Sequence, residues 1–283
     1  MSSVLLKTLI HFRNILIPYW KVPLKKEYDE LTRKIFIFYH IYCGPNNWKK
    51  IVIEQLSIMR VSELMTHVDK IYITVLGNDD DLDWIKENLH DVNYEIIYFS
   101  NDGSCFEFPC LAKMQHLARS FKFYALYIHT KGSSKNFNKN NSDHIQLKDN
   151  IESWRALLNY YNINKWKNAI YYLNKGYYTY GCLLMKKNNN FSSHYSGNFW
   201  WSTSENCLKS FIIENNDKTN KNRWIAEQWI VNNYNKAFCP FYSWVLLYDF
   251  NISNTTWLCR WYNINNIKYI LNHWKNGRKH LLY

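Results

Sequence analysis

The sequence predicts an α/β protein in which an open, mostly parallel β-sheet is flanked by helices. Two observations predict this fold class. Four apolar runs of strand length alternate with segments in which apolar residues recur at helical spacing. Polar residues also follow several of these runs directly, as expected where parallel strands end at a ligand-binding edge. At 283 residues the chain is long enough to bury a full core.

The first half of the chain supplies the predicted parallel strands. Residues 35–42, IFIFYHIY, form the first apolar run, and apolar residues between 48 and 59 then recur at helical spacing. The second strand is predicted over 71–76, followed by a helix that begins near 81–84. A third strand is predicted over 94–99. Strands joined through helices in this way form parallel crossover units.

The fourth repetition consists of a helix predicted over 109–120 and a strand that begins at 123, in FYALYIHTKG. The following residues, 133–150, are nearly all polar and are predicted to form a mobile loop that could close over a ligand. Helices are then expected over 151–161 and 166–173, where apolar residues again recur at helical spacing.

The last third of the chain is less regular. A strand is predicted over 179–185, TYGCLLM, and helices are predicted over 204–213 and 223–234. No internal repeat is visible in the sequence.

The sequence divides into an N-terminal amphipathic extension over 1–34, one main domain over 35–255 and a basic, aromatic helix over 256–283. The extension lacks the roughly 18 uninterrupted apolar residues that a spanning helix needs. Its cationic and aromatic character leaves two interpretations, which are peripheral contact with a membrane surface and packing against the body of the protein.

Charge and cysteine content limit the classes of partner. A net charge of +12 favours phosphate-bearing partners such as a nucleotide, a nucleic acid or an anionic membrane, and a solvated basic surface is the alternative. The seven cysteines include no CxxC pair and no Cys/His spacing typical of zinc. We therefore expect free thiols and a reducing, cytoplasmic location.

Polar residues stand at the ends of three predicted strands. These residues are His40, Asn101 with Asp102, and His129 with Lys131. The carboxyl ends of parallel strands lie at one edge of the sheet, so we expect these side chains to border one crevice. Each of them could instead be an ordinary turn residue.

The segment His129-Thr130-Lys131-Gly132 has the chemistry of a phosphate site. A lysine ammonium can neutralise a diphosphate, the threonine hydroxyl can donate to its oxygens, and glycine allows close backbone approach. The alternative is a strand end followed by a solvated turn. The sequence GxxxxGK[ST] is absent, so the segment is not a Walker loop.

A second segment, HYSGNFWW, combines polar and aromatic residues. His194, Gly197 and Asn198 precede Trp200 and Trp201. Flat aromatic faces of this kind stack on sugar rings, and asparagine offers both a donor and an acceptor. The two tryptophans could equally belong to the core.

Glu227 in AEQW is the candidate general base. It lies on a predicted helix between Trp224 and Trp229, where its carboxylate could be held partly out of water. A glutamate on the solvent-facing side of a helix is the alternative interpretation.

Taken together, YIHTKG, the pair Trp154-Arg155, HYSGNFWW and RWIAEQW resemble a group of glycosyltransferases with the GT-A type of Rossmann-like nucleotide-binding fold. HTK is also similar to rhamnan-synthesis proteins. The resemblance extends over about residues 35–234 and depends mainly on the order of the four motifs.

The resemblance implies transfer of a hexosyl group from a nucleotide-diphosphate-sugar donor to a hydroxyl of a glycan or glycoconjugate. It places the donor across the strand ends and the acceptor over the second half of the chain. On this interpretation we expect the leaving diphosphate to be stabilised by Lys131 and His129, and Glu227 to act as the base. The expected donor-binding residues are His40, Asn101, Asp102, Glu107, Thr130, Gly132 and Arg155, and the expected acceptor-binding residues are His194, Gly197, Asn198, Trp200 and Trp201. A nonenzymatic glycan-binding protein and a nucleic-acid-binding protein are the alternatives, and we predict no nucleic-acid partner.

The expected metal chemistry departs from the family pattern. Most GT-A enzymes have an Asp-x-Asp metal motif at the end of the central strand, where this chain has His129-Thr130-Lys131. We therefore predict no obligatory metal site and leave a role for Mn²⁺ or Mg²⁺ open. The acidic run Asp79–Asp81 with Asp83 is a competing metal site, although it could equally cap a helix.

Overall fold

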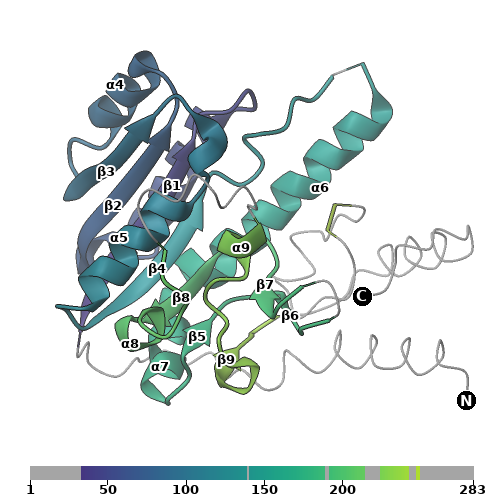
Figure 1. Ribbon diagram of the computed structural model, residues 1–283. Coiled ribbons are helices and arrows are strands. Elements are labelled where there is room, and N and C mark those ends of the chain that lie inside the picture. Colours follow the sequence, from purple (N-terminus) through teal and green to yellow (C-terminus); the bar gives the residue numbers. More distant parts are fainter. Residues whose placement is uncertain (1–32, 139, 189–190, 214–223, 242–246, 249–283) are drawn as a thin grey trace, which may run out of the picture.

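A seven-stranded mixed sheet with the order β3-β2-β1-β4-β8-β5-β9 forms the centre of the protein (Figure 1). The computed structural model describes residues 33–138, 140–188, 191–213, 224–241 and 247–248. The predicted C-terminal helix over 256–283 and all but the last two residues of the predicted extension over 1–34 lie outside these residues.

The first half of the chain forms four parallel strands, as predicted. They are β1 (Lys34–Tyr42), β2 (Val68–Leu76), β3 (Tyr94–Ser100) and β4 (Phe123–His129), and the helices between them are α3 (Trp48–Val61), α4 (Asp79–Asn88) and α5 (Phe108–Ala118). The pairs β1/β2, β2/β3 and β1/β4 are all parallel. The α/β class and the mostly parallel sheet are therefore confirmed, and they are compatible with a Rossmann-like fold.

The order of the strands reverses next to β1. The chain passes outward from β1 to β2 and β3, and then returns across the sheet so that β4 lies on the other side of β1. In open α/β sheets, the carboxyl ends of the strands at such a reversal border the ligand-binding crevice. His40 of β1 and His129 of β4 are directly paired at this point.

The second half of the chain extends the sheet beyond β4. Strand β8 (Trp200–Thr203) is antiparallel to β4 and to β5 (Thr179–Tyr180), and β5 is parallel to β9 (Ala237–Phe238). A separate antiparallel pair consists of β6 (Leu184–Met185) and β7 (His194–Tyr195).

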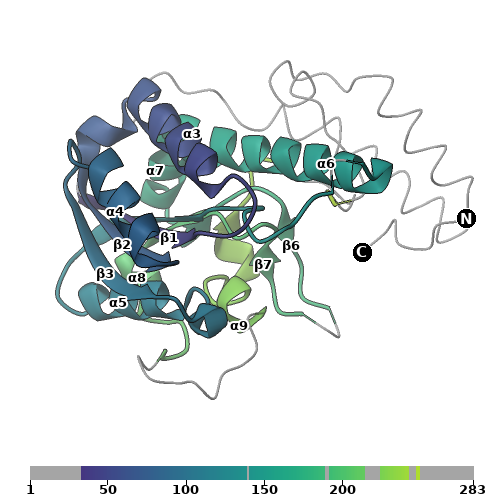
Figure 2. The same cartoon turned by 90° about the horizontal axis from the view of Figure 1, so that it is seen from above.

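The two faces of the sheet bury two apolar cores. Successive side chains of a strand point to opposite faces, so Ile37 and Tyr39 belong to one core and Phe36 and Phe38 to the other. Helices α3 and α6 cover the first core, and α5 and α9 cover the second (Figure 2). The loops at the strand ends are thus held by packed layers on both sides.

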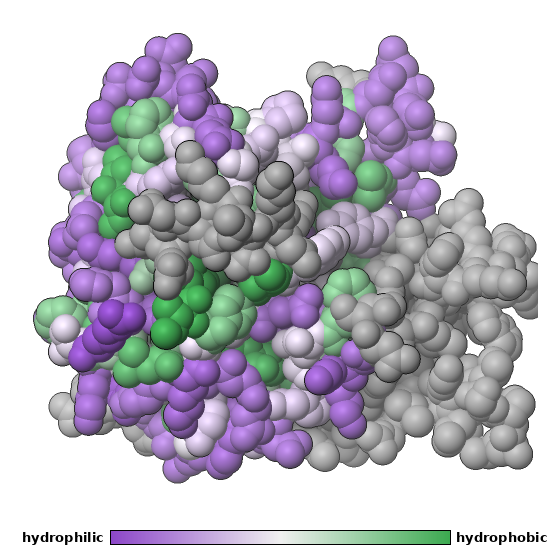
Figure 3. Space-filling model, viewed as in Figure 1, coloured by the Kyte–Doolittle hydropathy of each residue, from purple (hydrophilic) through white to green (hydrophobic). Residues whose placement is uncertain are grey.

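The predicted mobile loop over 133–150 is wrong in its second half. Helix α6 spans Ser142–Asn159, because the Asn141 side chain accepts hydrogen bonds from the backbone N–H groups of Asp143 and His144 and caps the helix. The first turns of α6 project from the body of the protein and are hydrophilic (Figure 3), so they carry no apolar periodicity. The helix continues as a π-turn over Tyr160–Asn164, followed by the predicted helix α7 (Trp166–Asn174).

Three other predicted elements are shorter than expected. The strand over 179–185 is interrupted at Leu183, whose φ of 61° is incompatible with an extended strand, so β5 and β6 join different sheets. The two helices over 204–213 and 223–234 are reduced to α8 (Ser204–Cys207) and α9 (Trp224–Glu227). The short 3₁₀ turns lie over Leu64–His67, Gly103–Cys105 and Tyr234–Lys236.

Within the described ranges, no helix is both long and apolar enough to cross a membrane.

Candidate functional site

A cavity of about 270 Å³ lies at the carboxyl ends of β1 and β4, where the strand order reverses. Its lining comes from the ends of β1, β2 and β4, the segment that precedes α5, the turn after β4, and two residues from later in the chain, Ile151 of α6 and Tyr248. The predicted crevice is therefore present, and it is formed by segments far apart in the sequence.

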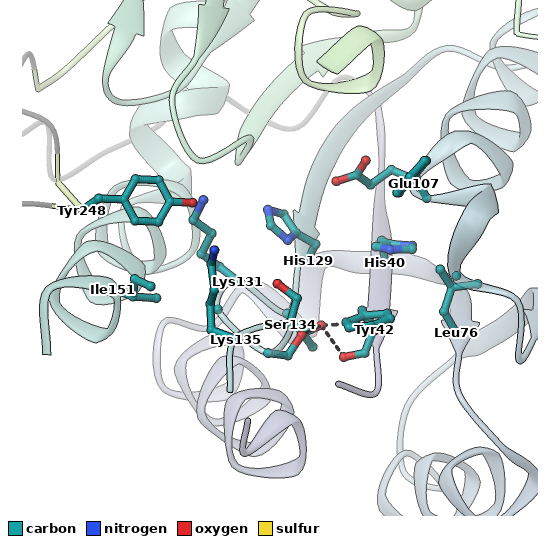
Figure 4. Close-up of a pocket in the computed structure, with 15 residues that line it drawn as sticks. His40, Tyr42, Leu76, Glu107, His129, Lys131, Ser134, Lys135, Ile151 and Tyr248 are labelled. Carbon is teal, nitrogen blue, oxygen red and sulfur yellow. Dashed lines mark hydrogen bonds between the residues drawn. The ribbon is translucent and has the colours of Figure 1, made fainter. Parts of the chain in front are cut away.

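Opposite walls of the cavity differ in charge. Lys131, Lys135 and Tyr248 lie on one side, and Glu107 lies on the other (Figure 4). His129 projects between them. A ligand in this cavity would therefore have cations at one end and a carboxylate at the other, which suits a molecule with one anionic part and one part rich in hydroxyl groups.

The ammonium group of Lys131 is held against aromatic rings. Its Nζ atom lies 3.8 Å from the centroid of the Trp154 ring and 5.7 Å from that of Tyr248. Lys135 Nζ lies 5.9 Å from the same tyrosine ring. Cation–π contacts restrict a lysine side chain without neutralising its charge, so both cations can still attract an anion.

The turn after β4 is fixed by buried polar groups beneath it. Gln55 donates to the carbonyl oxygen of His129 at 3.2 Å, and Arg155 donates to that of Lys131 at 3.2 Å. Arg155 also pairs with Glu54 at 3.2 Å and is 4% exposed. The predicted donor-binding role of Arg155 is not what this geometry favours, because its guanidinium supports the turn and does not line the cavity.

The hydroxyl of Thr130 connects β1 to β4. It accepts from the backbone N–H of Tyr42 at 2.9 Å and donates to the Tyr42 carbonyl oxygen at 3.0 Å. Ser133 donates a further hydrogen bond to it at 3.2 Å. Thr130 lines the cavity but is 3% exposed, so its hydroxyl serves the strand junction instead of the predicted contact with phosphate.

Gly132 is required by both backbone conformation and space. Its φ is +92°, and a Cβ atom there would lie 2.6 Å from Cγ2 of Ile151. The absence of a side chain thus allows α6 to approach the turn, and the carbonyl oxygen of Gly132 accepts a hydrogen bond from Asn46 at 3.1 Å.

His40 is a neutral group in this cavity. Burial lowers its pKa to about 4, and its Nδ1 is 2.8 Å from the hydroxyl of Thr74. His129 is also fixed, because its Nε2 donates to the carbonyl oxygen of Gly197 at 3.0 Å. The second contact joins the cavity to the HYSGNFWW segment.

The predicted aromatic acceptor surface is not exposed in the structure. Trp200 and Trp201 are 1% and 0% exposed. The Trp200 ring stacks on Tyr127 with centroids 5.0 Å apart, and Trp201 donates to the carbonyl oxygen of Asn162 at 2.7 Å. Both residues lie in β8 within the sheet, and the core interpretation of these tryptophans is the one that fits.

Gly197 and Asn198 shape the turn between β7 and β8. Gly197 has a φ of +90°, and a Cβ there would contact Leu158 at 2.7 Å and Trp154 at 3.0 Å. Asn198 is buried and accepts a hydrogen bond from Trp200 at 2.8 Å. Both residues therefore serve packing, and neither lines the cavity.

Four other predicted site residues lie outside the cavity lining. Asn101 is exposed, and Asp102 accepts from the backbone and hydroxyl of Ser104 at the start of a 3₁₀ turn. His194 lies on β7 and donates from Nδ1 to the Ser192 carbonyl oxygen at 2.8 Å. Glu227 ends α9 and is half-buried.

The acidic run after β2 caps a helix. Asn78 and Asp81 form a reciprocal capping box at the start of α4, with hydrogen bonds of 2.9 and 3.1 Å. In the part of the chain that the structure describes, no group of three or more His, Cys, Asp or Glu residues could hold a metal ion. The six cysteines in that part are free thiols, as expected.

Sequence reasoning missed Lys135 and Tyr248 in the cavity. Lys135 lies four residues after Lys131 in the same turn, and this spacing was a usable signal. Tyr248 comes from a segment without a pattern, and it is placed by its own carbonyl oxygen, which accepts from Asn150 at 2.8 Å.

The fold and the cavity define an α/β protein that is compatible with a Rossmann-like fold and has a crevice at the reversal of strand order. Comparisons of the chain with protein-family models and with curated proteins gave no match.

Proposed function

We propose that this protein is a glycosyltransferase that moves a hexosyl group from a nucleotide-diphosphate sugar to an acceptor hydroxyl. The observation that carries the proposal is the distribution of charge in the cavity. Lys131 and Lys135 lie on one wall, and Glu107 lies on the opposite wall. The glycosyltransferase resemblance of the HTKG segment supports the same assignment.

Departure of a nucleoside diphosphate leaves negative charge on its phosphate oxygens. Fixed cations that face this charge lower the barrier, because they stabilise the transition state more than the ground state. Lys131 and Lys135 are suited to this role, and the Arg155 and Gln55 contacts beneath the turn hold Lys131 in place. A divalent ion that arrives with the donor would add to the same effect.

The donor would lie across the ends of β1 and β4. His40 is a neutral hydrogen-bonding group at this edge, and Tyr248 offers a ring on the lysine side. The acceptor is a carbohydrate or a glycoconjugate, and we propose no nucleic-acid partner. Peripheral membrane contact through 1–34 stays a prediction, since residues 1–32 lie outside the described part of the chain. A cytoplasmic location also stays a prediction.

The test is calorimetric titration of the purified protein with UDP-glucose, UDP-N-acetylglucosamine, GDP-mannose and dTDP-rhamnose, followed by assays of donor hydrolysis with Mn²⁺ or with chelator. We expect one nucleotide class to bind and to be hydrolysed slowly. Binding of oligonucleotides in a salt-sensitive manner, without binding of any nucleotide sugar, would contradict the proposal and favour a nucleic-acid-binding protein.

Substitution of one cation tests the site itself. Lys131→Ala should lower turnover by about 10²-fold or more, because a charge that faces the leaving diphosphate is lost. The matched control is Lys86→Ala, which removes an exposed lysine of α4 that pairs with Asp83 at 3.0 Å. Equal turnover in the two variants, with both folded, would remove Lys131 from the mechanism.

A further inference from the structure

We infer that Glu107 is the general base of the proposed glycosyl transfer and that the reaction inverts the anomeric carbon. This inference rests on the proposed function. It replaces Glu227, which the sequence favours for the same role, with a carboxylate that lines the cavity.

The position of Glu107 relative to the lysines carries the inference. In an inverting displacement, the acceptor oxygen attacks the anomeric carbon from the side opposite the leaving group. The base must therefore lie across the cavity from the cations that receive the diphosphate. Glu107 lies across the cavity from Lys131 and Lys135, with His129 between them (Figure 4).

The backbone around Glu107 directs its side chain into the cavity. Phe106, which also lines the cavity, has a φ of 44°, a backbone conformation that is strained for a non-glycine residue. The carbonyl oxygen of Glu107 accepts from the N–H groups of Cys110 and Leu111 at 3.1 and 3.2 Å. The first turn of α5 thus fixes the Glu107 backbone, while its carboxylate makes no capping hydrogen bond with this helix.

Glu227 lies close to the same region without reaching the cavity lining. The Tyr127 hydroxyl is fully buried, and burial raises its pKa well above the usual value. The carboxylates of Glu107 and Glu227 raise the pKa of Tyr127 further, so both act electrostatically on this hydroxyl. Glu107 alone of the two also lines the cavity, and it can therefore reach a bound ligand.

The chemical step balances with the groups that line the cavity. The carboxylate of Glu107 takes the proton of the acceptor hydroxyl, and the acceptor oxygen forms a bond to the anomeric carbon with its electron pair. The bond from that carbon to the diphosphate oxygen breaks, and its electron pair leaves with the diphosphate beside Lys131 and Lys135. When water is the acceptor, the same step gives the free sugar with inverted configuration.

The experiment uses donor hydrolysis, because water serves as acceptor and no glycan need be known. The nucleotide sugar hydrolysed fastest in the panel above is given to the full chain and to Glu107→Gln, Glu107→Asp and Glu227→Gln. We expect Glu107→Gln to lower kcat by about 10²–10⁴-fold while binding of the nucleotide sugar is unchanged, as for loss of a general base. Glu227→Gln should retain most of the turnover.

Two further readouts separate a base from a residue that only supports the fold. The acidic limb of the kcat–pH profile should disappear in Glu107→Gln, and nuclear magnetic resonance of the released sugar should show the inverted anomer first. Glu107→Asp keeps the carboxylate one methylene further back, so it should lower kcat without changing the donor Kd. This variant decides the question if Glu107→Gln does not fold.

The outcomes distinguish the inference from the proposed function. If the unchanged protein neither binds nor hydrolyses any nucleotide sugar, the proposed function fails and the inference fails with it. If the unchanged protein is active and Glu107→Gln keeps its rate, or if the released sugar retains its configuration, the inference alone is overturned.

Discussion

His40 carries no positive charge at neutral pH, although it lines a cavity that contains two lysines. Burial lowers its pKa to about 4, and its Nδ1 lies 2.8 Å from the Thr74 hydroxyl. The attraction of the cavity for a phosphate group is therefore due to Lys131 and Lys135, and His40 contributes a hydrogen-bonding nitrogen. Its paired neighbour on β4, His129, is oriented by the Gly197 carbonyl oxygen instead.

This neutral histidine predicts a pH dependence of stability. The ordinary pKa of histidine is about 6.5, so between pH 6.5 and 4 the unfolded chain binds a proton that the folded protein does not bind. The contribution of His40 is fully present above pH 6.5 and is lost as the pH falls towards 4. The expected loss is about 3 kcal/mol of unfolding free energy.

Urea denaturation between pH 7 and 4 measures this effect. His40→Asn retains a polar side chain but removes the titrating group, so its unfolding free energy should fall less steeply than that of the unchanged protein. The slopes are compared rather than the absolute values, since the substitution also changes packing. Parallel slopes for the two proteins would mean that His40 is protonated as readily in the folded state as in the unfolded state.

Several site residues could be predicted from sequence because strand ends converge in parallel sheets. This argument correctly brought His40, His129 and Lys131 to one crevice. It failed for Asn101 and Asp102, because Asn101 is exposed and Asp102 caps a 3₁₀ turn, although the next residue, Gly103, does line the cavity. A motif gives the position of a polar side chain in the sequence, but it does not show which hydrogen-bond partners that side chain has in the folded protein.

At the scale of elements, the junction between β1 and β4 determines the shape of the cavity floor. The Thr130 hydroxyl joins these strands by accepting from the N–H of Tyr42 and donating to its carbonyl oxygen. The backbone N–H of Thr130 also donates to the His40 carbonyl oxygen at 3.2 Å. The Thr130 side chain therefore adds, beyond the last backbone pair of β1 and β4, a link between two residues that are 88 positions apart in the chain.

We predict that Thr130→Val destabilises the protein without abolishing nucleotide binding. Valine has nearly the same shape, but it leaves the partly buried N–H of Tyr42 without its acceptor, which costs about 1–3 kcal/mol. The control is Thr66→Val, whose exposed hydroxyl donates to the Glu63 carbonyl oxygen at 2.8 Å and should change stability by less than about 0.5 kcal/mol. Urea denaturation and calorimetry measure the two properties separately.

The opposite result would support the phosphate contact that the sequence predicts for the Thr130 hydroxyl. If Thr130→Val has the stability of the unchanged protein and binds no nucleotide sugar, the hydroxyl contacts the ligand and not the strand junction. Loss of both properties together would show that the junction must be intact before the cavity can bind.

Elements with a long apolar pattern were predicted correctly, and those defined by polar caps or by tertiary pairing were not. Strand β1 and helix α3 carry their own periodicity. The start of α6 depends on the Asn141 cap and on hydrophilic turns that contact little of the core. Strands β5 and β8 are only two and four residues long and are stabilised by their neighbours in the sheet, which no local window reveals.

At the scale of the whole molecule, aromatic residues fill both faces of the sheet. In the core between the sheet and α5, the Trp200 ring stacks on Tyr127 and lies 6.1 Å from that of Trp229. The two tryptophans of HYSGNFWW, which suggested a sugar-binding surface, thus serve to fill the interior. The sequence alone could not distinguish a core aromatic residue from one that binds a sugar, because burial depends on which strands and helices pack against the side chain.

The position of Trp200 gives a prediction that separates the core from an acceptor surface. Trp200→Ala should cost about 3–5 kcal/mol of unfolding free energy, because it leaves a large cavity beside Tyr127 and removes the partner of the Asn198 side chain. Trp224→Ala on α9 is the matched control. Trp224 is 47% exposed, so its loss should lower stability far less. Urea denaturation gives both values, and donor hydrolysis is then measured where each variant is folded.

A sugar-stacking residue would behave in the opposite way, with a stable Trp200→Ala variant that hydrolyses the donor normally but no longer responds to added acceptor. Because the Trp200 ring is enclosed by β4 and by the core around Trp229, we expect the loss of stability to dominate.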